Sequence, residues 1–312
     1  MSTPPRTRTW SPPAGAGSYR LHRHLGVLQR GPYDPACRFE DGAAWRGTRT
    51  PDGPAALRMR QERGTDGPVV RAEAWGPGAG WALETLPALL GGADDPSAFV
   101  PHHRLVAEAH RRHPGLRLAR TGLVLESLIP SVLEQKVTAE EAYRAWRLLV
   151  RRFGERAPGP NLSLHVMPSA RDWCRIPSWE WHRAGVDGKR SAAVVRAAQR
   201  ASRMEEAAGM ELDAALRRLQ AIPGIGPWTA AETLQRSNGD PDAVTVGDLH
   251  LPRIVGYALT GARGVDDAGM LELLAPYAEQ GQRHRATRLI LSTGRVPPRR
   301  QPRFPVGDIA PL

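Results

Sequence analysis

A tight turn between two predicted helices holds the first residues with a clear chemical use. Residues 222–226 read Ile-Pro-Gly-Ile-Gly. Two glycines around one apolar residue let the backbone reverse sharply and expose its amides, while the isoleucine anchors the turn in the core. Beside the helix predicted to start near Pro227, these N–H groups form an anion site suited to phosphate. A lone Gly-x-Gly also fits an ordinary turn between helices, but the full pattern favours a DNA-binding helix–hairpin–helix.

A carboxylate follows this turn, 19 residues beyond Thr229. Asp248 directly precedes a predicted helix, and aspartate is a favoured N-cap, so a structural role fits the position. Taken alone, the cap is the preferred interpretation. Taken together with the hairpin, the preference reverses and Asp248 becomes the candidate catalytic carboxylate.

The two features together resemble the signature of the helix–hairpin–helix DNA glycosylase superfamily, in which a hairpin of this sequence precedes a Val-x-Asp that opens a helix. Within the superfamily, the chain is most similar to bacterial 3-methyladenine DNA glycosylase II, the AlkA type. The similarity runs from about Leu89 to Gly294. The matching segments are Leu125–Thr138, Pro114–Leu118, Ala184–Val186 with Lys189-Arg190, and Tyr277–Glu279 with Arg285.

The resemblance implies the reaction. Breaking an N-glycosidic bond makes the sugar cationic, and an ionised carboxylate near the anomeric carbon stabilises that charge and orients the attacking water. Asp248 is assigned this role. Family members that also cut the strand carry a hairpin lysine that forms a Schiff base with the sugar. Because Trp228 stands at that position here, the expected enzyme is monofunctional and leaves an abasic site.

The resemblance also assigns DNA contacts. Base flipping leaves a gap in the stack that a side chain must fill. The AlkA-type wedge residue is apolar, whereas this chain has Lys136, whose ammonium fills a gap less well although its stem is apolar and its charge can grip phosphate. Gln135 can share the task, and a solvated helix start is the alternative for both. The complete predicted set is Gln135, Lys136, Pro223, Gly224, Ile225, Gly226, Thr229 and Arg285.

Two residues are predicted to shape the base pocket. Trp228 either stacks on the flipped base or is a core tryptophan at a helix start. One helical turn further on, Glu232 replaces an aromatic residue of the AlkA-type pocket. An acid there would favour a cationic base or open the site to bulkier adducts. The alternative is that Glu232 points to solvent.

Composition narrows the class of protein. The chain has 312 residues, a net charge of +11 and only two lysines, Lys136 and Lys189. Arginine bias has a simple cause in a GC-rich genome, but such a surface still attracts phosphate polyanions.

Two cysteines fit a reducing cytosol and cannot alone build a zinc or iron–sulfur site. We expect no metal and no cofactor except the monovalent cation at the hairpin that the resemblance implies. The chain contains no stretch of 18 uncharged apolar residues, so we expect no membrane span.

Hydrophobic patterns predict the elements that position these residues. Short alternating segments such as Ala44–Thr48 and Val69–Trp75 predict a small antiparallel sheet. A long helical stretch from Leu123 to Phe153, broken near Pro130, and helices around the hairpin predict a larger helical domain. The expected class is α+β, a small β-rich N-terminal domain followed by an all-helical glycosylase domain. The boundaries are a disordered tail 1–17, a β-rich domain 18–110, a helical domain 111–295 and a loose tail 296–312.

The expected function is therefore excision of alkylated purines, such as 3-methyladenine and 7-methylguanine, in base excision repair. One alternative is a glycosylase for deaminated, oxidised or bulky adducts, and another is a non-catalytic DNA-damage-binding protein. The expected partner is double-stranded DNA with a damaged base, bound by a monomer in the cytoplasm at the bacterial nucleoid.

Overall fold

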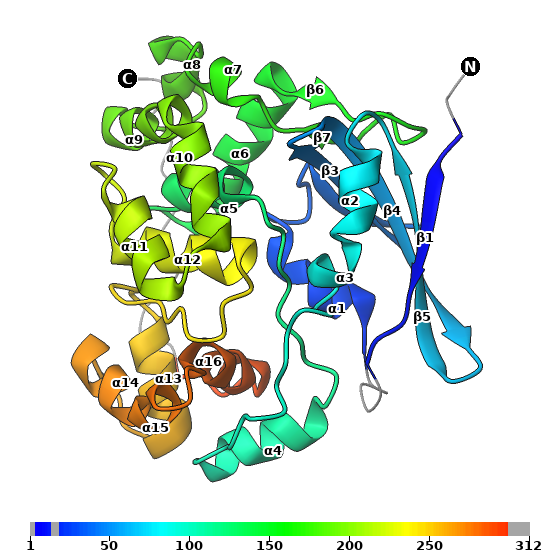
Figure 1. The fold of residues 1–312 in the computed structure, drawn as a ribbon. Coiled ribbons are helices and arrows are strands. Elements are labelled where there is room, and N and C mark those ends of the chain that lie inside the picture. Colours follow the sequence, from blue (N-terminus) through cyan, green and yellow to red (C-terminus); the bar gives the residue numbers. More distant parts are fainter. Residues whose placement is uncertain (1–3, 14–18, 299–312) are drawn as a thin grey trace.

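The computed structural model describes residues 4–13 and 19–298 (Figure 1). Its N-terminal part is built on an antiparallel sheet with the strand order β1-β5-β4-β3-β2. A separate pair, β6 with β7, forms a short hairpin. The strands are β1 (Arg6–Trp10), β2 (Cys37–Glu40), β3 (Ala43–Thr50), β4 (Gly53–Gly64), β5 (Gly67–Trp75), β6 (Glu155–Arg156) and β7 (His165–Val166).

The edge strand β1 corrects the predicted tail. Residues 1–17 were expected to be disordered, yet Arg6–Trp10 pairs along its whole length with β5, from Arg6 opposite Ala74 to Trp10 opposite Val70. Trp10 also packs edge-on against Tyr19. A five-residue strand at the edge of a sheet is held by backbone hydrogen bonds and by one aromatic contact. The Pro- and Arg-rich composition of the segment gives no sign of either. The rest of that tail, and residues 299–312 of the loose tail, lie outside the described residues.

Helices cover one face of the sheet and join it to the rest of the chain. Buried alanines and leucines of β4 and β5 pack against the apolar sides of these helices and against Tyr19. The opposite face carries a smaller cluster in which Trp75 meets Val166 of β7. The elements on the first face are α1 (Leu21–Leu25), η1 (Gly26–Leu28), α2 (Ala79–Glu84) and α3 (Leu86–Leu89).

The largest core belongs to the helices that carry the hairpin. In it α5 is buried on almost every side and packs against α9, α6 and α12. Pro130 lies inside α5, so the break predicted there is wrong; the chain leaves the helix only after Leu133. The elements are α5 (Val124–Leu133), α6 (Ala139–Phe153), α7 (Ala170–Trp173), α8 (Ser178–Arg183), α9 (Gly188–Gln199), α10 (Ala201–Glu205), η2 (Glu206–Gly209), α11 (Leu212–Gln220) and α12 (Pro227–Ser237).

A third cluster joins residues that are far apart in the sequence. Val106 of α4 packs with Val255, Leu274 and Leu289, so α4 belongs with the last helices (Figure 1). The predicted boundary at residue 110 therefore cuts through this cluster rather than between domains. Its helices are α4 (Arg104–Arg112), α13 (Leu251–Thr260), α14 (Asp267–Leu273), α15 (Ala275–Ala278) and α16 (Arg283–Ser292).

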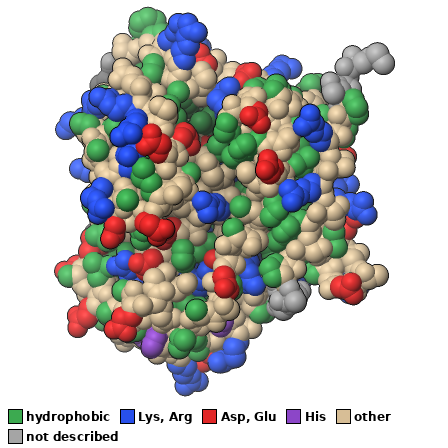
Figure 2. All heavy atoms as spheres, viewed as in Figure 1, with side chains coloured by type: hydrophobic (Ala, Val, Ile, Leu, Met, Phe, Trp, Pro, Cys, Tyr) green, Lys and Arg blue, Asp and Glu red, His purple; other side chains and the backbone are tan. Residues whose placement is uncertain are grey.

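The surface carries charge of both signs. Figure 2 shows Lys and Arg scattered over the viewed face, with Asp and Glu between them, rather than gathered in one patch. Among the described residues, no helix combines the length and the apolar character that crossing a membrane would need. The α+β class predicted from the sequence agrees with the sheet and the helical remainder.

Candidate active site

The hairpin connects α11 to α12 and presents its backbone outward. Gly224 has a φ of +96°, and a Cβ there would lie 2.9 Å from the Cβ of Ala193, so both the turn and the close approach need glycine. Ile225 is buried, whereas Pro223 and Gly224 are exposed. Within the described part of the chain, no group accepts a hydrogen bond from the Gly226 amide. The Gly226 amide is therefore available to a ligand, and the anion site at the turn stays a prediction.

The loop between α5 and α6 reaches the hairpin through Gln135. Its side-chain amide donates to the carbonyl oxygen of Gly224 (2.9 Å) and to Thr229 Oγ1 (2.8 Å). The next residue, Lys136, is exposed and has a φ of +55°, which turns the chain outward at the loop tip. Gln135 is thus tied to the hairpin, while Lys136 is the exposed member of the pair.

Two predicted DNA contacts are corrected by burial. Thr229 is buried and its hydroxyl is occupied by Gln135, so its side chain positions that residue instead of meeting DNA. Arg285 is only 1% exposed. Its guanidinium forms an ion pair with Asp94 and donates to Gln282 Oε1 (2.6 Å). A charge this deeply buried needs such partners, and the pair joins α16 to the segment before α4.

Asp248 lies in the loop before α13, where it holds three hydrogen bonds. Its Oδ1 accepts from the amides of His250 and Leu251, both at 2.7 Å, so it binds the first amide of the helix, although the N-cap position itself belongs to His250 and not to Asp248 as predicted. Its Oδ2 accepts from the indole nitrogen of Trp228 (2.9 Å), two residues after the hairpin. The structural and the chemical interpretations of Asp248 are therefore compatible, because the two amides use one oxygen and leave the other facing Trp228.

These hydrogen bonds set the charge of Asp248. Burial alone would raise the pKa of its carboxyl group, but the Trp228 indole and the two backbone amides outweigh that effect and bring the pKa below its ordinary value. Asp248 is consequently ionised at neutral pH. A carboxylate offers about four lone-pair positions. Three are used, so one position on Oδ2 remains for a substrate or a water.

Asp248 lines a cavity of about 600 Å³. Its wall comes from α1, the segment before Leu118, α12, the loop that carries Asp248, α13 and α16. Such a volume lies within the range of roughly 300–1,000 Å³ typical of small-molecule pockets. Trp228 does not line this cavity, contrary to the prediction that it shapes the base pocket. It acts on the site indirectly, through its hydrogen bond to Asp248.

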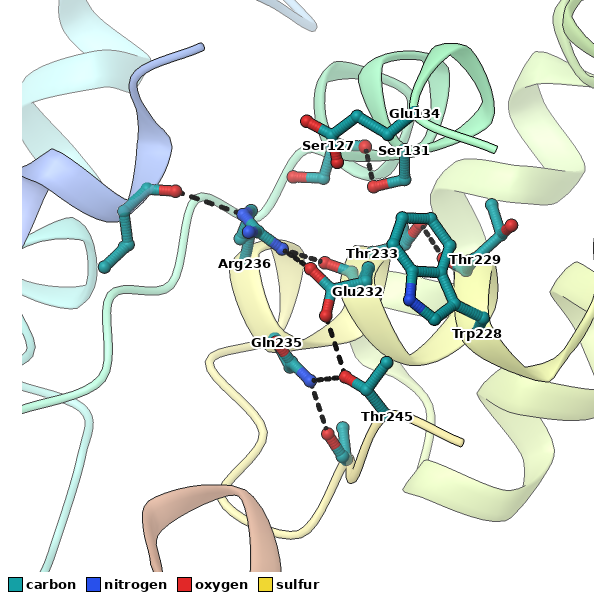
Figure 3. A network of polar contacts seen from close by, with 12 residues as sticks. Ser127, Ser131, Glu134, Trp228, Thr229, Glu232, Thr233, Gln235, Arg236 and Thr245 are labelled. Atoms are coloured by element: carbon teal, nitrogen blue, oxygen red, sulfur yellow. Dashed lines mark hydrogen bonds and ion pairs between the residues drawn. The ribbon is translucent and has the colours of Figure 1, made fainter. Parts of the chain in front are cut away.

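Glu232 is in the cavity wall, but its charge is neutralised. Its Oε2 pairs with Arg236 (2.7 Å) and its Oε1 accepts from Thr245 Oγ1 (2.7 Å), as Figure 3 shows. Burial alone would raise the pKa of Glu232, yet the Arg236 charge and these hydrogen bonds lower it. The alternative that Glu232 points to solvent is wrong. Because Arg236 offsets its charge, Glu232 is not a free acid that would attract a cationic base.

Three further side chains line the cavity and were not singled out from the sequence: His24 of α1, and His284 and Arg288 of α16. Burial lowers the pKa of His24 to about 4. Burial and the nearby Arg288 lower the pKa of His284 well below its ordinary value, so both imidazoles are neutral at pH 7. Only their convergence in space reveals them, because one helix lies near the N-terminus and the other near the end of the chain.

The monovalent cation expected at the hairpin remains a prediction. Backbone carbonyl oxygens would have to hold it, and those of Pro223 and Gly224 already accept hydrogen bonds from Arg196 (3.2 Å) and Gln135 (2.9 Å). A carbonyl oxygen has two lone pairs, so both can still take a second partner. Among the described residues, no group of three His, Cys, Asp or Glu side chains could hold a metal ion.

Sequence comparison finds curated relatives that match part of the chain. A protein of Mycobacterium tuberculosis, described as a probable bifunctional transcriptional activator and DNA repair enzyme AlkA, is 32% identical over 142 residues. The match covers 44% of this chain and 28% of that protein. The chain thus spans little more than a quarter of the length of these relatives. No model of a known protein family matches the chain.

Solved structures match nearly the whole fold. The 3-methyladenine DNA glycosylase of Archaeoglobus fulgidus aligns with a TM-score of 0.70 at 16% identity, covering 91% of this chain and 97% of that one. The 8-oxoguanine glycosylase/lyase of Clostridium acetobutylicum, in complex with double-stranded DNA, aligns with a TM-score of 0.68 at 10% identity, covering 89% and 92%. In fold and in part of its sequence, the chain is similar to the helix–hairpin–helix DNA glycosylases, AlkA-type proteins among them.

Proposed function

We propose that this protein is a monofunctional DNA glycosylase, which flips a damaged base out of the duplex, hydrolyses its N-glycosidic bond and leaves an abasic site. The observation that carries the proposal is the position of Asp248. An ionised carboxylate lines a cavity large enough for a base and is linked by Trp228 to the start of α12, directly beside the hairpin. The hairpin that would bind the DNA backbone and the carboxylate that would face the sugar are thus joined by this hydrogen bond.

The chemical step uses the free position on Asp248 Oδ2. As the bond between C1′ and the base nitrogen breaks, its electron pair leaves with the base and C1′ becomes positive. The fixed negative charge of Asp248 stabilises this centre, since it is oriented before the reaction by three hydrogen bonds. A water oxygen then bonds to C1′ and its proton is released to solvent; a cationic alkylated base leaves as a neutral molecule, whereas a base that was neutral leaves as an anion and takes a proton from solvent.

The absence of a suitable lysine supports hydrolysis over strand cleavage. A Schiff base needs an amine beside the sugar carbon. The residue whose nitrogen faces Asp248 is Trp228, and an indole nitrogen is a donor without nucleophilic character. Lys136 lies at the exposed loop tip and Lys189 in the first turn of α9, and neither lines the cavity.

The DNA grip combines backbone and side chain. The hairpin amides and the N-terminus of the eleven-residue helix α12 suit a phosphate. Lys136 would fill the gap left by the flipped base, and its place on a loop that Gln135 fixes to the same hairpin supports this role. We expect a monomer to bind double-stranded DNA in this way, in the cytoplasm at the nucleoid.

Two substrate classes have support. The sequence match with an AlkA protein supports alkylated purines such as 3-methyladenine and 7-methylguanine, whose glycosidic bonds are already weak. The polar cavity wall, with Gln235, Thr245 and two neutral histidines, supports a base that carries extra polar groups. The second class is also supported by the neutralised Glu232, because the other carboxylate in the wall, Asp248, is the one proposed to face the sugar and not the base.

A panel of duplexes, each with one modified base, tests the proposal. After incubation with the protein, each sample is divided and one half is treated with hot alkali. We expect breaks at one lesion class only in the alkali-treated half, because an abasic site must first be formed and then cleaved. Breaks without alkali would contradict the monofunctional mechanism. Tight lesion binding with no breaks in either half would replace the enzyme by a DNA-damage-binding protein.

A further inference from the structure

The cavity wall contains an excess of positive charge. Five arginines and two carboxylates line it. The two carboxylates offset only part of this charge: Glu232 pairs with Arg236 and Thr245, and Asp248, held by its indole and amide donors, faces the proposed sugar position. A purine that is alkylated at a ring nitrogen is itself a cation. Such a base would enter this cavity against unfavourable charge unless it brought a negative group of its own.

One arginine stands out because it is partly buried and yet has no protein partner among residues 4–13 and 19–298; Arg20, which also lacks one, is exposed. Arg288 is partly buried in the wall, and no described residue forms a hydrogen bond or an ion pair with its guanidinium. By contrast, Arg285 on the same helix is fully paired with Asp94. Burial and the neighbouring charge of Arg236 lower the pKa of Arg288 to about 10 although the nearby Glu232 favours the charged form, and Arg288 stays protonated at neutral pH. A buried cation without a partner is costly, so a ligand that supplies the missing charge is favoured.

The neighbour one turn away fits the same ligand. His284 is 5% exposed, lines the cavity, and makes no side-chain hydrogen bond to a described residue. Because its imidazole is neutral, it offers one N–H donor and one acceptor. A guanidinium fork binds a carboxylate through two parallel hydrogen bonds. Arg288 and His284 therefore present three donors from one face of α16.

We infer that the cavity accepts an alkylated purine whose added group carries a carboxylate, and that Arg288 determines this specificity by binding the carboxylate. The inference rests on the proposed glycosylase function and names its substrate class. The positive ring keeps the weak glycosidic bond that makes excision easy, while the carboxylate offsets the charge of the wall. A cavity of about 600 Å³ has room for the ring and the appended group.

Duplex DNA that contains both 7-methylguanine and 7-(carboxymethyl)guanine provides the test, because the two bases share the cationic ring and differ in the carboxylate. Release of each free base is followed by mass spectrometry. We expect the wild-type protein to release the carboxymethyl base about tenfold faster, the scale of one charge-assisted pair. Arg288→Gln should reduce this ratio to about one, and Arg288→Lys should give a value between the two.

Arg104→Gln is the matched control, since Arg104 is 94% exposed on α4, outside the cavity, and the variant should keep the wild-type ratio. Continued release of 7-methylguanine shows that each Arg288 variant is folded and active. An unchanged ratio in Arg288→Gln would overturn the inference while leaving the glycosylase function intact. An equal loss of both bases would also overturn it, by assigning Arg288 to a DNA phosphate. Release of neither base by the wild-type protein would overturn the inference, and the panel of modified bases decides separately whether the protein is a glycosylase.

Discussion

The hairpin and the cavity recognise their ligands by different means. At the hairpin the groups on offer are backbone amides, held outward by Gly224 and by an anchoring isoleucine. In the cavity they are side chains, each with its charge set by neighbours, such as Glu232 by Arg236 and Asp248 by Trp228. Backbone amides bind phosphate, which is the same for every base sequence, whereas charged side chains in the cavity can distinguish one base from another. The first region therefore suits affinity for any duplex and the second suits choice among bases.

Substitution of Asp248 should give the largest difference between the two regions, with a strong effect on excision and little effect on DNA affinity. Asp248→Asn keeps the size of the side chain and its acceptor toward the amides of α13, but removes the charge that faces C1′. We expect single-turnover excision to slow by about 10²-fold or more, the scale for one preorganised electrostatic group. Affinity for a lesion duplex, measured by fluorescence anisotropy, should stay within about twofold of wild type.

Excision by Asp248→Asn at the wild-type rate would remove Asp248 from the mechanism. Asp266→Asn is a suitable control, because Asp266 also binds an amide at a helix start, that of α14, yet lies outside the cavity. A similar loss in that control would point to a general effect of losing a helix cap instead of a charge effect at the site.

Substitution of Gly224 should give the opposite result. A Cβ at a φ of +96° is strained and would meet Ala193 at 2.9 Å, so Gly224→Ala must shift the hairpin. We expect binding to weaken by about tenfold, for damaged and undamaged duplexes alike, because strain of about 1–2 kcal/mol acts on the shared grip. Gly264→Ala is the control, since Gly264 also has a positive φ but its Cβ would meet nothing within 4 Å. A loss limited to lesion duplexes would contradict the division between the two regions.

The same division explains what could be predicted from the sequence. The hairpin is a run of five residues whose types dictate its shape, and Asp248 follows it at short range, so both could be found without coordinates. The sheet and the main helices also follow from local patterns. Arg288 and His284 could not be found in this way, because their function depends on side chains of α1 and α12 that the fold brings beside α16.

Arg285 is a residue whose predicted role was wrong for the same reason. Family resemblance placed it at the DNA, but its guanidinium turns into the core toward Asp94, 191 residues away in the sequence. Arg288, three residues later on the same helix, faces the cavity instead. Nothing in the local sequence distinguishes the two arginines, because the difference depends on which acid the fold places beside each one. Likewise, β1 forms only because β5 offers a free edge.

Trp228 connects the two regions, and its substitution should have the smallest effect. Trp228→Phe keeps an aromatic ring beside the hairpin but removes the hydrogen bond to Asp248 Oδ2. That bond lowers the pKa of Asp248, so its loss raises the pKa. Because the active form is the carboxylate, activity disappears as pH falls through this pKa, and the acidic limb of the rate profile should move to higher pH. At pH 7 we expect excision to slow by about threefold, only part of the contribution of a charge-assisted hydrogen bond, because the amides of His250 and Leu251 still hold the carboxylate.

The Trp228 measurement is a set of single-turnover rates across pH, with Trp179→Phe as the control, because Trp179 is 64% exposed on α8. If the acidic limb of Trp228→Phe coincides with that of wild type, the indole does not tune Asp248, and the helix amides alone must keep it ionised. If DNA affinity falls while the limb stays in place, Trp228 belongs to the grip. A shifted limb at unchanged affinity would instead show that the residue in the lysine position of strand-cutting relatives here serves the carboxylate, coupling the start of α12 to the charge that the sugar meets.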